Sequence, residues 1–355
     1  MASHSAEQVK IGVIGAGIGQ SHLRGYKQVP HAKIVALCDM DTDRARQVAK
    51  DLDLEAIQIY GDYHEMLEKA DVDAVSVGLP NFLHAEATID CLQAGKHVLC
   101  EKPLAMNAQE AQTMADAAAK SGKKCMVGQV SRFRAESQYL KKLVESGELG
   151  RVYYAQAGLL RKKGIPGYGG WFTTKEMSGG GPLIDLGVHL LDIAWWLAGK
   201  PNPVAVSGVT YAEFGPRQQG LGAWGARDLE GTFDVEDLAA GLIRFDNGLT
   251  INLEVSWALH NRGNTTWCRL FGTEGGLDWD WQDKASLFKD INGAEATISL
   301  ALEKADNWAA QTGHFVDCIL HDKTPDPDVT QGVTMMKMLE GLYKSAETGR
   351  EVEIT

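Results

Sequence analysis

The chain has 355 residues, of which 44% are hydrophobic and 23% charged, and its formal net charge is −12. This length suits about two globular domains, and the negative charge argues against a surface that binds nucleic acid or another polyanion. No C-x-x-C pair, signal-peptide pattern or run of about 18 apolar residues is present, so we expect a cytoplasmic protein with free thiols.

Strands and helices alternate over the first 130 residues. Short apolar runs predict the strands, and a polar or amphipathic helical segment follows most of them. The expected strands are 10–15, 32–39, 73–80, 96–102 and 124–129, and the expected helices are 21–29, 42–52, 85–95 and 107–122. This alternation predicts a doubly wound parallel sheet, and therefore a nucleotide-type α/β domain over residues 1–130.

The pattern changes after about residue 131. Helices are expected at 137–149 and 179–199 and through most of 307–348, and strands at 151–160 and within 203–214, 237–257 and 265–280. An Asn-Gly hairpin turn within 237–257 indicates antiparallel strands. Residues 131–355 are therefore expected to form an α+β domain with a large open, mainly antiparallel sheet that binds substrate and joins copies of the chain. Its alternating apolar residues would otherwise leave a wet apolar face; they are Leu242, Ile243, Leu249, Ile251, Leu253 and Val255.

A glycine-rich loop joins the first expected strand to the first helix. Gly15, Gly17 and Gly19 lie where a backbone approaches a pyrophosphate and helix N–H groups point at it. Asp39 follows 24 residues after Gly15, near the spacing of a ribose-binding carboxylate, which favours NAD over NADP. Alternatively, Asp39 merely caps the next helix. Arg44 either faces a phosphate or is a solvated helix residue.

The residues Glu101, Lys102 and Pro103 end an apolar strand abruptly. In a doubly wound sheet, ligands lie beyond the carboxyl ends of the strands, so these charges would face a crevice. Pro103 would hold a fixed turn there, in which a cis bond is one option. The alternative is a solvated turn between a strand and a helix.

A second candidate site lies in the segment 179–192. Asp185 and His189 are four residues apart, which places them on one face of a helix, where the carboxylate can set the imidazole tautomer as a general base requires. Glycines 179–181 would let backbone or ligand approach closely. Two alternatives are a metal site that adds Asp192 and a purely structural pair.

Together these features resemble the Gfo/Idh/MocA oxidoreductases, and the resemblance runs over essentially the whole chain. It rests on the glycine loop at 15–19 and on residues 79–86, 100–105, 179–192 and 271–277. The resemblance implies a Rossmann domain, a second domain with a large open sheet, and sheet-mediated dimers or tetramers. It also implies nicotinamide-dependent oxidation or reduction of a sugar or cyclitol hydroxyl.

The resemblance also implies roles for single residues. Lys102 matches the lysine that polarises or orients the reacting oxygen, His189 the general acid/base, and Asp185 the carboxylate that binds substrate or supports proton transfer. The residues expected at the cofactor are Gly15, Gly17, Ile18, Gly19, Asp39, Leu79, Pro80, Asn81, His84, Glu101 and Gln129, with Glu101 beside the nicotinamide. No metal is expected. The departure from the family pattern is Gln20, which replaces the final glycine of the loop.

Sugar recognition needs aromatic faces and polar groups, and two segments offer them. The residues expected at the substrate are Arg161, Tyr168, Trp171, Trp257 and His260. Each of them could instead be a packing or surface residue.

Three functions remain open. The leading hypothesis is an NAD-dependent dehydrogenase of a sugar, glycoside or cyclitol. The second is an enzyme that cleaves glycosides by transient oxidation at C3 and elimination, for which Lys102, Asp185 and His189 would serve equally well. The third is a nucleotide-sensing regulatory protein without turnover, which the intact proton-transfer set disfavours because a sensor needs no such relay.

Overall fold

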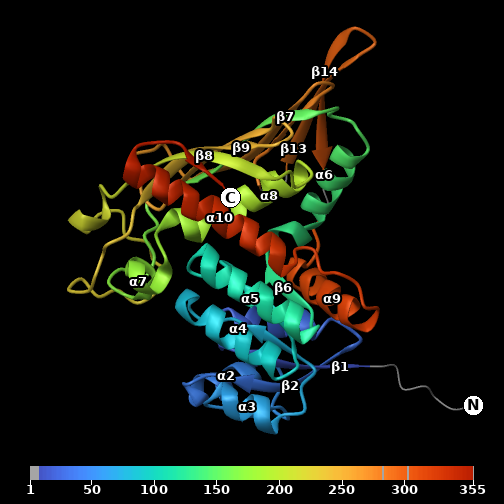
Figure 1. The fold of residues 1–355 in the computed structure, drawn as a ribbon, viewed down its shortest axis with the longest axis vertical. Helices are drawn as coiled ribbons and strands as arrows, with labels where there is room; N and C mark the ends of the chain where they lie inside the picture. The colour runs from blue at the N-terminus through green and yellow to red at the C-terminus, as the bar shows by residue number, and fades with distance from the viewer. Residues whose placement is uncertain (1–7, 282–283, 302–303, 355) are drawn as a thin grey trace, which may run out of the picture. The chain divides into compact units, whose positions relative to one another are not determined.

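The computed structural model describes residues 8–281, 284–301 and 304–354, and the chain divides into two compact units (Figure 1). Unit 1 comprises Met1–Arg134 with Ala305–Val333, and unit 2 comprises Ala135–Lys304 with Thr334–Thr355. The division therefore differs from the single expected boundary after residue 130, because a late helix returns to the first unit. Within the described residues, no helix combines the length and apolar character needed to span a membrane.

Unit 1 is built on a six-stranded sheet in the order β3-β2-β1-β4-β5-β6, with every neighbouring pair parallel. Its strands are β1 (Val9–Ile14), β2 (Ala32–Cys38), β3 (Gln58–Tyr60), β4 (Ala74–Val77), β5 (His97–Glu101) and β6 (Cys125–Gly128). Its helices include α1 (Gly19–Tyr26), α2 (Thr42–Asp51), α3 (Tyr63–Lys69), α4 (His84–Gln93), α5 (Ala108–Ser121) and α9 (Asn307–Leu320). The expected Rossmann fold is confirmed, and the strand order reverses between β1 and β4, where such sheets bind ligands.

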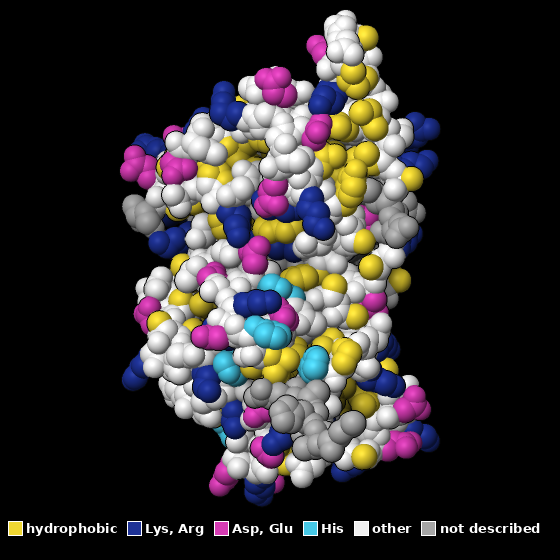
Figure 2. Space-filling model, turned by 90° about the vertical axis from the view of Figure 1, so that its right-hand side faces the viewer, with side chains coloured by type: hydrophobic (Ala, Val, Ile, Leu, Met, Phe, Trp, Pro, Cys, Tyr) yellow, Lys and Arg dark blue, Asp and Glu magenta, His cyan; other side chains and the backbone are white. Residues whose placement is uncertain are grey.

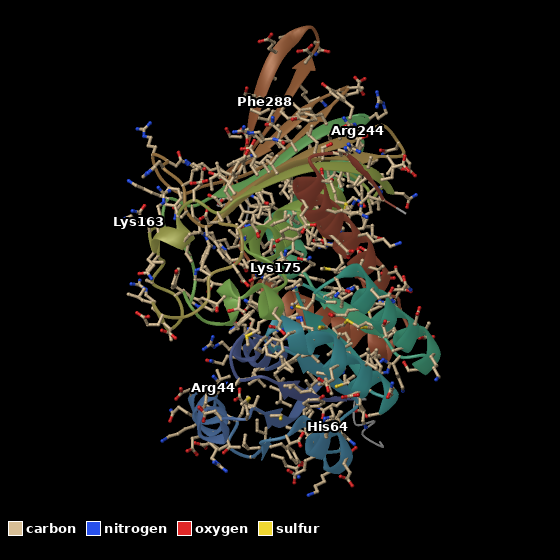
Figure 3. The ribbon with its side chains drawn as sticks, turned by 60° about the vertical axis from the view of Figure 1, so that its left-hand side comes forward. Arg44, His64, Lys163, Lys175, Arg244 and Phe288 are labelled. Carbon is tan, nitrogen blue, oxygen red and sulfur yellow. The ribbon has the colours of Figure 1, made fainter. Side chains whose placement is uncertain are left out.

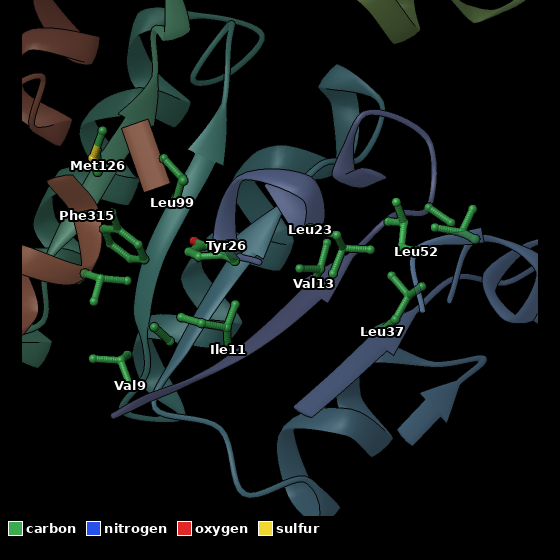
Figure 4. Close-up of a cluster of buried hydrophobic side chains, with 14 of the residues drawn as sticks. Val9, Ile11, Val13, Leu23, Tyr26, Leu37, Leu52, Leu99, Met126 and Phe315 are labelled. Atoms are coloured by element: carbon green, nitrogen blue, oxygen red, sulfur yellow. The ribbon is translucent and has the colours of Figure 1, made fainter. Parts of the chain in front are cut away.

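The core of unit 1 surrounds β1 (Figure 4). Ile11 and Val13 are fully buried, as are Leu23 on α1 and Phe315 on α9. Gly25 allows α1 and α9 to pack closely, because a Cβ there would lie 2.7 Å from the carbonyl oxygen of Trp308. This packing explains why α9 belongs with the first unit although it begins about 180 residues beyond the end of β6 in the sequence.

Unit 2 contains a nine-stranded sheet in the order β14-β13-β12-β11-β7-β10-β9-β8-β15. Its strands are β7 (Val152–Leu160), β8 (Pro203–Tyr211), β9 (Leu238–Phe245), β10 (Thr250–Ser256), β11 (Thr265–Gly272), β12 (Gly276–Trp279), β13 (Lys284–Ile291), β14 (Ala294–Ala301) and β15 (Val352–Glu353). Among the described strands of this sheet, β7 and β10 pair in parallel and the other neighbours are antiparallel. The large, mainly antiparallel sheet is thus confirmed.

Helices cover one face of this sheet, and Figure 1 shows α8 and α10 along it. The helices of the unit include α6 (Ala135–Glu145), α7 (Lys175–Ser178), α8 (Val188–Leu197) and residues 334–348 of α10 (Val329–Thr348). The apolar residues expected on an open face lie mostly on this covered face. Ile243, Leu249, Ile251, Leu253 and Val255 are all buried, and only Leu242 points to the other side.

The other face of the sheet carries exposed aromatic and aliphatic side chains. Val209 and Tyr211 on β8 and Phe288 on β13 are exposed by 46%, 51% and 42%. The rings of Tyr154 and Phe271 lie 5.7 Å apart on the neighbouring strands β7 and β11. Figure 2 shows hydrophobic side chains gathered below the tip of the β13–β14 hairpin, and Figure 3 labels Phe288 on it. We call the residues Tyr154, Val209, Tyr211, Phe271 and Phe288 the open face.

Candidate active site

The glycine loop after β1 leaves room for a phosphate group. Gly15 has a φ of +96°, and a Cβ there would lie 2.2 Å from the carbonyl oxygen of Gly78, so this position requires glycine. A Cβ at Gly17 would meet no atom within 4 Å, and α1 then begins without a side-chain cap. Open space in front of an uncapped helix N-terminus fits the pyrophosphate of a dinucleotide.

Asp39 lies at the end of β2 and faces this loop. Its carboxylate is 5% exposed, and it accepts a hydrogen bond of 2.7 Å from the amide of Ala16 inside the glycine loop. The N-cap of α2 is Asp41, so Asp39 is not the helix cap that the alternative interpretation required. Arg44 on α2, labelled in Figure 3, donates to both carboxylate oxygens at 2.7 Å. Arg44 is therefore paired with Asp39 rather than merely solvated.

The loop after β4 carries Leu79, Pro80, Asn81 and His84. His84 is buried, and its Nδ1 and Nε2 atoms lie 2.7 and 2.8 Å from the carbonyl oxygens of Pro103 and Leu79. Burial lowers the pKa of His84, and the two carbonyl contacts oppose that effect. The ring thus fastens the loop after β4 to the turn after β5 and leaves little of itself for contact with a cofactor.

A buried polar network lies beneath the end of β5. The Oε1 atom of Glu101 lies 2.9 Å from Nε2 of His22 on α1, whose Nδ1 lies 3.1 Å from the hydroxyl of Ser76. The hydroxyl of Tyr26 joins the same serine at 2.8 Å. Glu101 is 5% exposed, so it holds the strand end in place from within. His22 is a residue that the sequence patterns did not single out.

Lys102 follows Glu101 and is half-buried between two buried neighbours. Its amide donates a hydrogen bond of 3.2 Å to Oε2 of Glu101, and the bond from Lys102 to Pro103 is cis, as the sequence suggested. Gln129, which follows the next strand, is buried. The carboxyl ends of the parallel strands β1, β2, β4, β5 and β6 share one edge, so the expected cofactor residues of this unit gather there.

The helix that carries Asp185 and His189 is otherwise buried. From Gly181 to Leu197, these two are the only residues that are not buried. The first part of the helix, Leu183–Gly187, is a π-helix, a rare conformation that is frequent at functional sites. Two ionisable groups that are partly exposed on an otherwise buried helix are candidates for proton transfer.

Trp257 follows β10 and contacts Asp185. Its indole N–H donates to Oδ2 of Asp185 at 3.0 Å, and the side chain is fully buried. The indole therefore has no exposed face for a sugar in this structure, contrary to the expected contact. Arg161 is half-buried at the adjacent end of β7, which is parallel to β10.

The other residues expected at the substrate pack against aromatic rings of unit 2. Tyr168 is 4% exposed and stacks on Phe233 with ring centroids 5.5 Å apart, so it packs rather than binds. Trp171 is half-buried against Phe172, and the exposed His260 lies edge-on to Phe214.

The structure also reveals a buried carboxylate that the sequence patterns did not single out. Glu236 lies just before β9 and accepts hydrogen bonds from the amides of Gly181 and Leu183 and from the hydroxyl of Tyr343. The pKa of Glu236 is raised because burial disfavours the charged carboxylate, and the three hydrogen bonds offset only part of this effect. The only sequence signal that could have pointed to Glu236 was its position as an acid directly before an apolar strand.

No metal cluster emerges from the residues that the structure describes, since no group of three or more His, Cys, Asp or Glu side chains there could hold a metal ion. Asp192, the third ligand of the alternative metal site, is 2% exposed. Among the described residues, unit 1 offers a loop that fits a dinucleotide phosphate, and unit 2 offers Asp185 and His189 as groups that can exchange protons.

Comparisons with known proteins identify relatives over the whole length. Residues 9–129 match the model described as "Oxidoreductase family, NAD-binding Rossmann fold", and residues 137–278 match the "GFO/IDH/MocA C-terminal domain". D-glucoside 3-dehydrogenase of Escherichia coli (strain K12) is 34% identical over 99% of both chains. The scyllo-inositol 2-dehydrogenase (NAD(+)) of Bacillus subtilis (strain 168) is 28% identical over 90% of this chain and 88% of the relative. A levoglucosan dehydrogenase solved with NADH and L-sorbose shares the fold, with a TM-score of 0.88 at 23% identity over 98% of this chain and 99% of the other.

Proposed function

Because the chain belongs to the Gfo/Idh/MocA family of NAD-binding oxidoreductases, we propose that it oxidises a secondary hydroxyl of a glucoside or related pyranoside, or reduces the matching ketone. The observation that carries this proposal is the 34% identity to a D-glucoside 3-dehydrogenase over nearly the full length of both chains. The chain is an oxidoreductase that acts on CH–OH groups. NAD, when bound, supplies the hydride acceptor.

Three residues carry the proposed chemistry. His189 takes the hydroxyl proton as the C–H hydride leaves, and Lys102 stabilises the negative charge that develops on the oxygen. Asp185 orients either the imidazole or a neighbouring substrate hydroxyl, and Trp257 holds that carboxylate through its N–H at 3.0 Å. Fixed charges and dipoles of this kind act most strongly where water is excluded. Arg161, Trp171 and His260 remain candidates for contacts with the substrate.

The proposal is tested by a panel of alkyl and aryl glucosides, cyclitols and 3-keto sugars. The expected result is NADH formation from one or more glucosides without release of the aglycone. Formation of NADH and release of aglycone are measured separately on the same samples.

Two results would contradict the proposal. Aglycone release without net NADH would instead favour the glycoside-cleaving enzyme, which the dehydrogenase names of the relatives do not favour. NADH binding without turnover of any member of the panel would favour the nucleotide-sensing protein.

We also propose that the protein is a homo-oligomer in which a second copy covers the open face. A hollow of about 390 Å³ lies on this face and is lined by Arg269, Phe271, Gly276, Leu277, Asp278 and Phe288. The ion pair between Arg269 and Asp278, at 3.1 Å, adds polar contacts to this apolar surface. Exposed apolar patches of this kind mark protein–protein contacts.

Charge placed on the open face is expected to separate the copies. The double variant Phe271→Glu/Phe288→Glu should show a monomeric mass by light scattering, because a desolvated carboxylate opposes association. Tyr139→Glu, on α6 at 46% exposure, is the matched control and should keep the wild-type mass. A monomeric wild-type protein would refute the proposal.

The cellular compartment that we propose is the reducing cytoplasm. All six cysteines are free and buried. Burial raises the pKa of Cys38 and Cys100 to about 12, which keeps these thiols protonated and unreactive. Fusion of the chain to a fluorescent protein and microscopy of the cells would test the location.

A further inference from the structure

The helix that carries Asp185 and His189 begins against a buried carboxylate. Glu236 is 8% exposed, and its Oε2 atom accepts the amide of Gly181 at 2.9 Å. Its Oε1 atom accepts the amide of Leu183 at 3.0 Å and the hydroxyl of Tyr343, on α10, at 2.9 Å. A negative charge at a helix N-terminus is favourable, and all three donors point at one side chain. The first turn of the helix is therefore tied to two other elements of unit 2.

Glu236 and Tyr343 lie so close to the backbone at residues 180 and 181 that only glycine fits at these two positions. A Cβ at Gly181 would lie 2.0 Å from the carbonyl oxygen of Glu236, and a Cβ at Gly180 would lie 2.1 Å from the hydroxyl of Tyr343. The glycines that were expected to admit backbone or ligand thus admit Glu236 and Tyr343. These contacts leave the turn little freedom to shift.

Gly181 links this anchor directly to Asp185. Its N–H donates to Glu236, and its carbonyl oxygen accepts the amide of Asp185 at 3.0 Å. Asp185 lies within the π-helix, a rare conformation that occurs mostly as a single turn inside an α-helix. A displacement of Gly181 would move Asp185, and His189 lies one turn further on.

We propose that Glu236 and Tyr343 are positioning residues that set the orientation of Asp185 and His189 for proton transfer. The proposal rests on the proposed function of those two residues. It differs from a purely structural role, in which the anchor would stabilise the fold and leave the chemistry unchanged.

The test compares two hydroxyl deletions on the same helix. Tyr343→Phe removes the hydroxyl that donates to Glu236 and that also lies within hydrogen-bond reach of the backbone at Gly181 and Ile184. Ser345→Ala is the matched control, because Ser345 is 2% exposed and bonds to Gly208 and Arg350 but does not contact the turn at 181–183. Glu236→Gln is expected to have the larger effect, because one carboxylate oxygen becomes an amide NH₂ group that faces the N–H and O–H donors of Gly181, Leu183 and Tyr343.

For each variant we would measure the melting temperature, the Kd for NADH, kcat and KM, and the titration of the His189 imidazole by NMR, assigned with His189→Ala. Tyr343→Phe is expected to lower kcat about tenfold and Glu236→Gln about a hundredfold, since small misplacements of catalytic groups cost this much. Both should shift the midpoint of the His189 titration and leave the Kd for NADH unchanged. Ser345→Ala should lower the melting temperature alone.

If Tyr343→Phe and Glu236→Gln behave as Ser345→Ala does, with unchanged kcat and an unchanged His189 titration, the positioning role is wrong. If the wild type turns over no pyranoside, the proposed function fails. The NMR titration then still decides whether Glu236 and Tyr343 set the environment of His189.

Discussion

Replacement of Lys102 or His189 by alanine is expected to lower kcat on an accepted pyranoside by roughly 10²–10⁴, the range that a placed proton-transfer residue supplies. His189 loses its role as proton acceptor, and Lys102 its charge near the developing oxyanion. The Kd for NADH should change little in His189→Ala, because the predicted contacts to the pyrophosphate and ribose, at the glycine loop and Asp39, do not involve His189. Stopped-flow turnover and fluorescence titration of NADH measure the two quantities.

Exposed residues of the same types provide the controls. His64 and Lys175, both labelled in Figure 3, have side chains that are 59% and 56% exposed. Their alanine variants should retain wild-type kcat. Near-full turnover in both Lys102→Ala and His189→Ala would refute the assignment of these residues.

The second prediction concerns cofactor selectivity. Asp39→Ala is expected to weaken NAD binding about tenfold or more, since hydrogen bonds to a charged group contribute about 1.5–3 kcal/mol. It should also strengthen NADP binding, because it removes a negative charge near the 2′-phosphate and releases Arg44 from its pair with Asp39. Titration with both cofactors gives the ratio of their Kd values.

A double variant that also replaces Arg44 distinguishes the loss in NAD binding from the gain in NADP binding. In Asp39→Ala/Arg44→Ala the gain in NADP binding should disappear, while the loss in NAD binding should persist. Asp39→Asn keeps an acceptor for the amide of Ala16 and controls for loosening of the loop. A wild-type protein that prefers NADP more than tenfold would contradict the proposed role of Asp39.

Local patterns in the sequence were enough to predict the fold class. Buried parallel strands are continuous apolar runs, so β1, β2, β5 and β6 were each found within one residue of their ends, while β4 ends three residues before its expected end. The three-residue strand β3 and helix α3 were missed because they carry too few apolar residues to show a period. The strands β13 and β14, on the exposed part of the second sheet, were missed as well.

The glycine loop, Asp39, the turn at Lys102 and the spacing of Asp185 and His189 could be predicted from the sequence, because each depends on residues within one strand end or one helical turn. The distant residues that support them became evident in the folded chain alone. Gly181 and Glu236 are 55 residues apart, Glu236 and Tyr343 are 107 apart, and Trp257 reaches Asp185 across 72. Such contacts depend on strand register and helix packing, which bring the residues together only when the whole sheet has formed and leave no local period in the sequence.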